Sequence, residues 1–220
     1  ITAVLPRANP HDAFLSLRHQ RFADLPQGAR VGTSSPRRQA QLRHARPDLR
    51  LELLRGNVDT RLRRLAEGEL DAILLACAGL ERLGLGSRIT QVLDLELSLP
   101  AVGQGVIGIE CREDDATSRA ALVALHHEPS FVRLKAERAF AQTLGGSCHS
   151  PIAAHAAIDR ESLVVHGFVG SPDGHEVYRD VERGNPADTE ALGQRLATRI
   201  QAAGAGALLD RLRDEAAAAS

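Results

Sequence analysis

Short apolar runs alternate with amphipathic segments over the first part of the chain. The runs are rich in aliphatic residues and end at polar positions, as strands of a buried sheet do. Apolar residues in the segments between them recur at helical spacing. The predicted strands cover 13–17, 29–33, 51–54 and 70–76, and the predicted helices cover 36–45, 58–66 and a turn near Leu80. This alternation predicts an α/β fold, with a parallel or mixed sheet that helices cover on both faces.

A different pattern begins after Pro151. A proline- and glycine-containing crossover at 98–105 leads into a predicted strand at 106–111, and helices are predicted at 114–127 and 130–143. Three apolar runs follow, at 152–158, 163–169 and 176–181, with a Ser-Pro-Asp-Gly hairpin turn at 171–174, and helices are predicted at 188–203 and 205–215. This second part is expected to be an α+β unit with a three-stranded antiparallel sheet.

The stretch Gly32–Arg38 combines the features of an anion-binding helix start. Ser35 suits the N-cap of a helix, and Pro36 suits its first position, where a missing N–H is no loss. A helix N-terminus carries partial positive charge and free N–H donors, and the forked donors of Arg37 and Arg38 bind carboxylates or phosphates. An ordinary capped surface helix has the same signals, so this stretch alone leaves both interpretations open.

A second corner at Arg55–Arg61 repeats this arrangement. Gly56 permits a turn after a predicted strand, and Asn57 suits the N-cap of the next helix. Both corners are expected at the carboxyl ends of strands, where sheets of this class bind ligands. Residues 30 to 64 include ten arginines and three acidic residues, a local charge of +7 in a chain of net charge −1. This asymmetry favours a localised anion site over the alternative, a solvated basic helix face.

Composition narrows the possible partners. The 220 residues, 43% hydrophobic and 25% charged, are those of a globular protein that can bury a substantial core. No apolar run reaches the length of a transmembrane helix, so no membrane partner is expected. The net charge and an aromatic content of 3% oppose a nucleic-acid partner. No metal site is expected, because no histidine lies at ligand spacing from a second cysteine.

The three cysteines are far apart and odd in number, which favours a reducing, cytoplasmic setting. Cys77 and Cys111 fall in apolar runs and are expected to be core thiols within strands. Cys148 lies instead in a glycine- and serine-rich loop beside His149, where a thiol is expected to be exposed and able to form a thiolate. The alternative role of this cysteine is that of a small buried hydrophobe.

Together these segments resemble the porphobilinogen deaminase family, also called hydroxymethylbilane synthase. Five motifs in the family's order carry the resemblance, at 31–39, 54–61, 80–85, 99–105 and 145–148. The resemblance implies a monomeric, cytoplasmic transferase of tetrapyrrole and haem biosynthesis. Such an enzyme joins four porphobilinogen molecules head to tail, with loss of ammonia, on a dipyrromethane cofactor that a thioether links to Cys148.

The resemblance also implies roles for the residues of both corners. Guanidinium, hydroxyl and backbone groups would hold the acetate and propionate groups of the pyrroles. The implied cofactor-binding residues, besides Cys148, are Thr33, Ser34, Ser35, Arg37, Arg38, Arg55 and Gly56, and the implied substrate-binding residues are Arg61, Arg82 and Gln104.

The family's architecture divides the chain into three parts. Its first two domains are hinge-linked and resemble periplasmic binding proteins, and its third domain carries the cysteine. The resemblance assigns residues 1–8 and 101–123 to remnants of the first domain, 14–98 to the second and 128–220 to the third.

The family's catalytic aspartate lies ahead of the residue that matches Ile1, and none of Asp12, Asp24 or Asp48 corresponds to it. A missing N-terminal part is therefore expected. No catalytic residue is expected in this chain, which alone is expected to be inactive. A non-catalytic carboxylate-binding module with an unmodified Cys148 is the alternative function.

Overall fold

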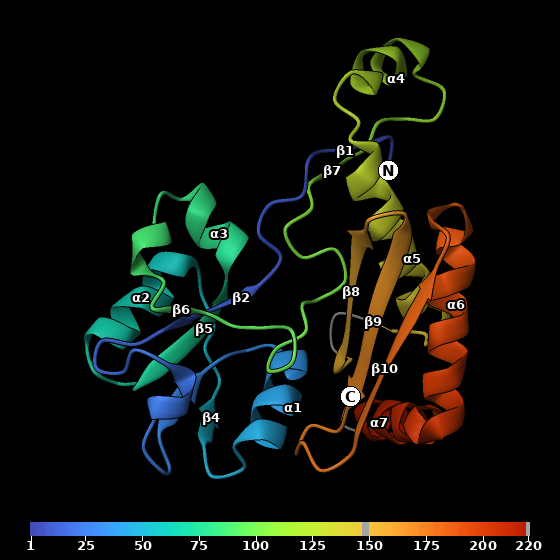
Figure 1. Cartoon of the computed structure of the whole chain (residues 1–220). Helices are drawn as coiled ribbons and strands as arrows, with labels where there is room; N and C mark the ends of the chain where they lie inside the picture. The colour runs from blue at the N-terminus through green and yellow to red at the C-terminus, as the bar shows by residue number, and fades with distance from the viewer. Residues whose placement is uncertain (147–149, 219–220) are drawn as a thin grey trace.

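The computed structural model of the chain describes residues 1–146 and 150–218. Two bodies stand side by side, joined by extended segments that run between them (Figure 1). One is built on a five-stranded sheet of order β4-β3-β5-β2-β6, and the other on a three-stranded sheet of order β10-β9-β8. A two-stranded ribbon of β1 (Ala3–Val4) and β7 (Gly108–Ile109) lies beside the end of the second body. The fold is thus an α/β body followed by an α+β body, as the sequence predicts.

The five-stranded sheet is mixed. Its strands are β2 (Asp12–Leu15), β3 (Arg30–Gly32), β4 (Arg50–Glu52), β5 (Ala72–Ala76) and β6 (Gln91–Val92). β3 pairs in parallel with β4 and β5, whereas β2 pairs antiparallel with β5 and β6. The helices α1 (Pro36–Ala45), α2 (Val58–Ala66) and α3 (Cys77–Arg82) follow β3, β4 and β5. Because these strands run in one direction, the three helices begin along one edge of the sheet.

Burial on both faces of this sheet follows the strand alternation. Ile73 and Leu75 of β5 belong to an apolar cluster that includes Leu62 of α2. Leu74, between them in sequence, belongs to a cluster on the other side that includes Leu42 of α1. Strands buried on both faces read as continuous apolar runs, which is why the sequence identifies them without a period-two pattern.

In the second body, helices cover one face of an antiparallel sheet. Its strands are β8 (Ile152–Asp159), β9 (Ser162–Gly170) and β10 (Val177–Gly184), and its helices are α5 (Glu128–Thr143), α6 (Thr189–Ile200) and α7 (Gly206–Ala218). Phe140, Val165 and Leu196 lie in the core between the helices and the sheet. α5 and α6 pack closely at Gly193, where a Cβ would lie 2.2 Å from the carbonyl oxygen of Ala136.

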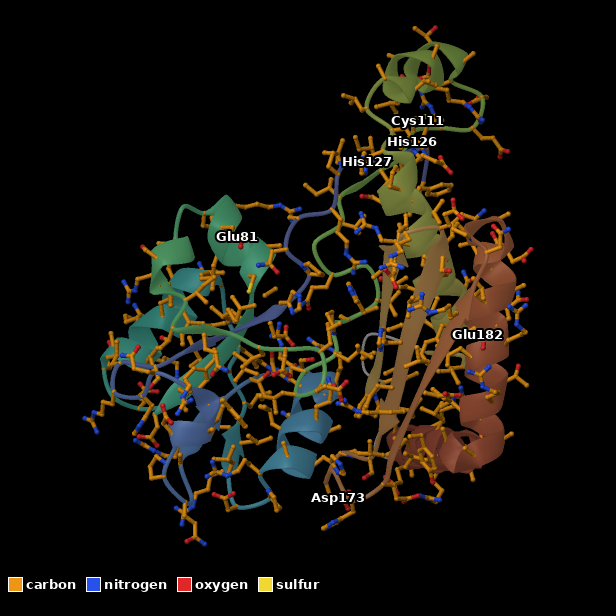
Figure 2. The ribbon with its side chains drawn as sticks, in the orientation of Figure 1. Glu81, Cys111, His126, His127, Asp173 and Glu182 are labelled. Carbon is orange, nitrogen blue, oxygen red and sulfur yellow. The ribbon has the colours of Figure 1, made fainter. Side chains whose placement is uncertain are left out.

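The other face of this sheet packs against the α/β body. Phe168 of β9 lies in one buried cluster with Ala40 of α1, and α1 stands between the two sheets in Figure 1. The turn between β9 and β10 contacts the C-terminal end of α1, since Nδ1 of His44 lies 3.0 Å from the carbonyl oxygen of Gly174. Figure 2 shows Asp173 of this turn below α1. The second body therefore contacts α1 at its middle and near its C-terminal end.

The predicted elements differ from the observed ones mainly at their ends. The ranges predicted for α1 and α2 are confirmed, and the three antiparallel strands are confirmed to within three residues. The predicted strand 106–111 contains only the two residues of β7, and the predicted helix 114–127 is shortened to α4 (Ala116–Val123). The strand β6 was not predicted, because two residues are too few to form a pattern.

The prediction that Cys77 and Cys111 lie within strands is wrong. β5 ends at Ala76, so the buried Cys77 is the first residue of α3. Cys111 lies beyond β7 and is half-buried, with its Sγ 3.3 Å from Oγ1 of Thr2. Among the described residues, no helix combines the length and the apolar character that a membrane span needs.

Candidate active site

The first corner forms where β3 ends and α1 begins. Ser35 is the N-cap of α1, and its Oγ accepts the backbone N–H of Arg38 at 3.4 Å. Oγ1 of the buried Thr33 accepts the N–H of Ser35 at 3.3 Å, and Ser34 is half-buried between them. These hydroxyls shape the turn that positions the two arginines of the first helical turn, as a capped helix start requires.

The guanidinium groups of Arg37 and Arg38 converge on Asp12, the first residue of β2. Arg37 donates from Nη1 to Oδ2 at 2.7 Å, and Arg38 donates from Nη2 to Oδ1 at 2.6 Å. Ser98 and Gln104 also donate to this carboxylate, at 2.6 Å and 3.0 Å. All three charged side chains are buried. Asp12 was not predicted to be a site residue, since it lies far along the chain from both arginines.

This buried cluster keeps all its charges and carries a positive surplus. Burial alone raises the pKa of Asp12, but the charges and hydrogen bonds of Arg37 and Arg38 outweigh it and hold this pKa well below its ordinary value. Burial lowers the pKa of Arg37, a shift that Asp12 opposes and Arg38 reinforces. Arginine nevertheless remains protonated at neutral pH. Two cations therefore face one anion.

The second corner has a similar local design at the start of α2. Oδ1 of Asn57 accepts the N–H of Thr60 at 2.9 Å, which caps the helix. Gly56 has φ +105°, and a Cβ there would lie 3.1 Å from the Thr60 side chain. Arg61 folds back and donates from Nε to the carbonyl oxygen of Gly56 at 2.8 Å, whereas Arg55 is exposed. Glycine is thus needed here for its backbone angle, and a side chain would also be tight against Thr60.

A cavity of about 280 Å³ joins the two corners. Arg38 lines it from the first corner, Gly56 and Arg61 from the second, and Gly79 from α3. Burial lowers the pKa of Arg61, and the charge of Arg38 lowers it further, so these two cations influence one another across a shared space. No acidic residue of the described chain lines this cavity, so it suits an anion.

A larger cavity of about 420 Å³ lies between the two bodies. Its described lining comes from α1, the crossover, α5 and β8, and comprises Ser35, Arg37, Ala101, Val102, Arg138, Ala141, Gln142, Gly146, Ser150 and Ile152. Nε of Arg37 is buried and has no hydrogen-bond partner among the described residues. Cys148 lies outside the described residues, but Gly146 and Ser150 on either side of it line this cavity.

The remaining predicted residues, Gln104 and Arg82, contact the crossover or the buried cluster. Oε1 of Gln104 accepts from Nη2 of Arg37 at 3.3 Å, so Gln104 belongs to the buried cluster. Nη2 of the exposed Arg82 donates to the carbonyl oxygen of Gly105 at 3.0 Å. Of the predicted residues, Ser35 and Arg37 line the larger cavity, and Arg38, Gly56 and Arg61 line the smaller one. The residues that line neither are Thr33, Ser34, Arg55, Arg82 and Gln104.

Comparison with known proteins identifies the family of this site. Residues 1–120 match the family model described as porphobilinogen deaminase, dipyromethane cofactor binding domain. The chain belongs to the porphobilinogen deaminase family. Residues 131–202 match a second model of the family, porphobilinogen deaminase, C-terminal domain.

Relatives named porphobilinogen deaminase cover most of this chain. The relative from Thiobacillus denitrificans is 50% identical over 94% of the chain and 67% of its own length. Those from Trichlorobacter lovleyi and Syntrophotalea carbinolica are 48% and 45% identical over 93% and 96% of the chain, and over 65% and 67% of their own lengths. The chain thus spans about two thirds of the length of these enzymes.

Proposed function

We propose that the protein joins four porphobilinogen molecules head to tail, with release of ammonia, on a dipyrromethane held by Cys148. The observation that carries this proposal is the larger cavity, whose described lining contains two arginines and no acidic residue and which flanks the cysteine loop. Each pyrrole carries an acetate and a propionate group, so a space with a surplus of positive charge suits the growing chain.

The residues present fit a dipyrromethane. Nε of Arg37 is a buried donor without an acceptor in the described chain, and a ligand carboxylate supplies acceptors. Arg38 and Arg61 share the smaller cavity, which no described acid lines; Arg38 also pairs with Asp12 behind it. When bound, the dipyrromethane supplies the carbon atom to which an incoming pyrrole is joined.

The chain's own residues would bind and orient carboxylates. The proposed cofactor contacts come from Thr33, Ser34, Ser35, Arg37, Arg38, Arg55 and Gly56, and the proposed substrate contacts come from Arg61, Arg82 and Gln104. Asp12 holds Arg37 and Arg38 in fixed positions, so their donors need little reorganisation when an anion enters. Charge pairing of this kind positions pyrroles, but it moves no protons.

Catalysis also requires a carboxylate that stabilises positive charge on the reacting pyrrole. No acidic side chain of the described residues lines either cavity, and Asp12 is already paired with two arginines. We therefore propose that this chain alone does not turn over porphobilinogen. A monomeric state and a cytoplasmic location belong to the same proposal; the three widely spaced cysteines support the latter.

Turnover measurements test this proposal. The chain is assayed for consumption of porphobilinogen and release of ammonia, alone and joined to the third of the Thiobacillus denitrificans relative that it does not cover. We expect turnover by the joined protein and none by the chain alone. Turnover by the chain alone contradicts the need for a further carboxylate, whereas an inactive, folded joined protein contradicts the proposed function.

A further inference from the structure

Arg138 faces the larger cavity from the opposite body to Arg37. It lies on α5, is exposed, and lines both this cavity and a neighbouring hollow of about 290 Å³ that residues of α5 and α6 line. Gln142, one helical turn further along α5, lines the same two spaces. These two polar side chains therefore mark where the cavity and the hollow meet. Neither residue was assigned to the site from the sequence.

Arg138 has no polar partner in the described part of the chain, in contrast to its charged neighbours on α5. Lys135 forms an ion pair with Glu190 at 3.3 Å, and Arg133 donates to the carbonyl oxygen of Pro129 at 2.9 Å. No described residue gives Arg138 an ion pair or a hydrogen bond. Its forked donors thus remain available at the cavity wall.

The charges around the cavity favour an anion in contact with Arg138. Across the cavity stands Arg37, part of a buried cluster in which two guanidinium groups share one carboxylate. No acidic residue is found among the described lining residues. A polycarboxylate that spans this space meets a guanidinium group on each wall.

We propose that Arg138 binds a carboxylate of the pyrrole chain from the α5 side of the cavity, an inference that rests on the proposed function. A space of about 420 Å³ is within the range of small-molecule sites, and a chain of pyrroles presents carboxylates in more than one direction. Arg37 and its neighbours take those on one side, and Arg138 takes one on the other. The ligand class is a polycarboxylate with acids on both of its edges.

Calorimetric titration tests this assignment. The probe is a synthetic dipyrromethane with an acetate and a propionate on each ring, and the protein is the full chain carrying Cys148→Ser, so that binding stays reversible. We expect Arg138→Gln to weaken binding about tenfold, the loss of one charge-assisted hydrogen bond. Arg18→Gln is the matched control, because Arg18 is exposed, has no side-chain partner among the described residues and lines none of these spaces.

Further measurements separate the possible outcomes. The tetramethyl ester of the probe has no carboxylate, so Arg138→Gln should not change its affinity. The assignment of Arg138 is overturned if Arg138→Gln and its parent bind the acid with equal affinity. It is also overturned if Arg18→Gln loses as much affinity as Arg138→Gln. Either result leaves the proposed function standing. Failure of the parent to bind the acid at all contradicts the proposed function itself. Unchanged thermal unfolding of each variant shows that the fold is retained.

Discussion

Replacing Asp12 with asparagine is expected to lower the free energy of unfolding by about 3–5 kcal/mol, the usual cost of removing one partner from a buried ion pair. The variant leaves the guanidinium groups of Arg37 and Arg38 buried without their shared counter-charge. Each must then be desolvated without compensation, and the two repel each other. Urea unfolding, monitored by circular dichroism, measures the change.

The matched control for this prediction is Asp159→Asn. Asp159 pairs with Arg183 at 2.9 Å, but both side chains are more than half exposed, so water replaces the lost partner. We expect a change of about 1 kcal/mol or less. If Asp12→Asn were no more destabilising than this control, the buried cluster would not hold the α/β body together.

The pH dependence of the free energy of unfolding gives a second test of the role of Asp12. Its folded pKa lies below the ordinary value of 3.8, so its stabilising effect is complete above that pH and is lost as the pH falls further. Burial, followed by the charge of Arg7, lowers the pKa of His155 to about 3, which also makes the fold acid-sensitive below pH 6.5. The variant keeps His155, so both proteins share its effect. We therefore expect the difference in free energy of unfolding between Asp12→Asn and the parent to narrow only below about pH 4.

The second large effect is expected at Glu137 of α5. Its carboxylate receives two hydrogen bonds from Arg7 and one backbone N–H each from Gly103 and Ala156. Glu137 therefore links the segment after β1 and the crossover to strand β8. The side chains of Arg7 and Glu137 are almost completely buried. We expect Glu137→Gln to cost about 3–5 kcal/mol, because it leaves the Arg7 guanidinium buried and unpaired.

A double-mutant cycle separates this pairing from simple packing. Arg7→Met with Glu137→Leu removes both charges, and we expect the double variant to be more stable than the sum of the two single changes implies. Glu190→Gln on α6 is the surface control, since its pair with Lys135 is exposed and contributes about 1 kcal/mol or less. If the losses of unfolding free energy in the two single variants simply added up in the double variant, a direct interaction between Arg7 and Glu137 would be contradicted.

Local signals in the sequence were sufficient for the helix starts. α1 begins at Pro36 because Ser35 caps it, and α2 begins at Val58 because Asn57 does. The same signals identified the two corners that line the smaller cavity. These features depend on neighbouring residues, so a single sequence carries the information.

The ion pairs of the site could not be predicted from neighbouring residues, because their partners lie far apart in the sequence. Asp12 meets arginines 25 and 26 positions away, and Arg7 meets Glu137 over a separation of 130. One signal for Glu137 was present: it lies three positions from both Leu134 and Phe140, on the apolar face of a helix. A carboxylate at such a position requires a buried partner, although the sequence does not identify which one.

The intact mass of the denatured joined protein, the chain together with the third of the Thiobacillus denitrificans relative that it does not cover, tests the central claim most directly after purification from cells that make tetrapyrroles. We predict that it exceeds the mass calculated from its sequence by two linked pyrroles, and that its Cys148→Ser variant has the calculated mass. The relative itself, purified in the same way, is the positive control. The bare calculated mass for the unmutated joined protein, beside a modified relative, would contradict a cofactor at Cys148 and would favour a carboxylate-binding module without catalysis.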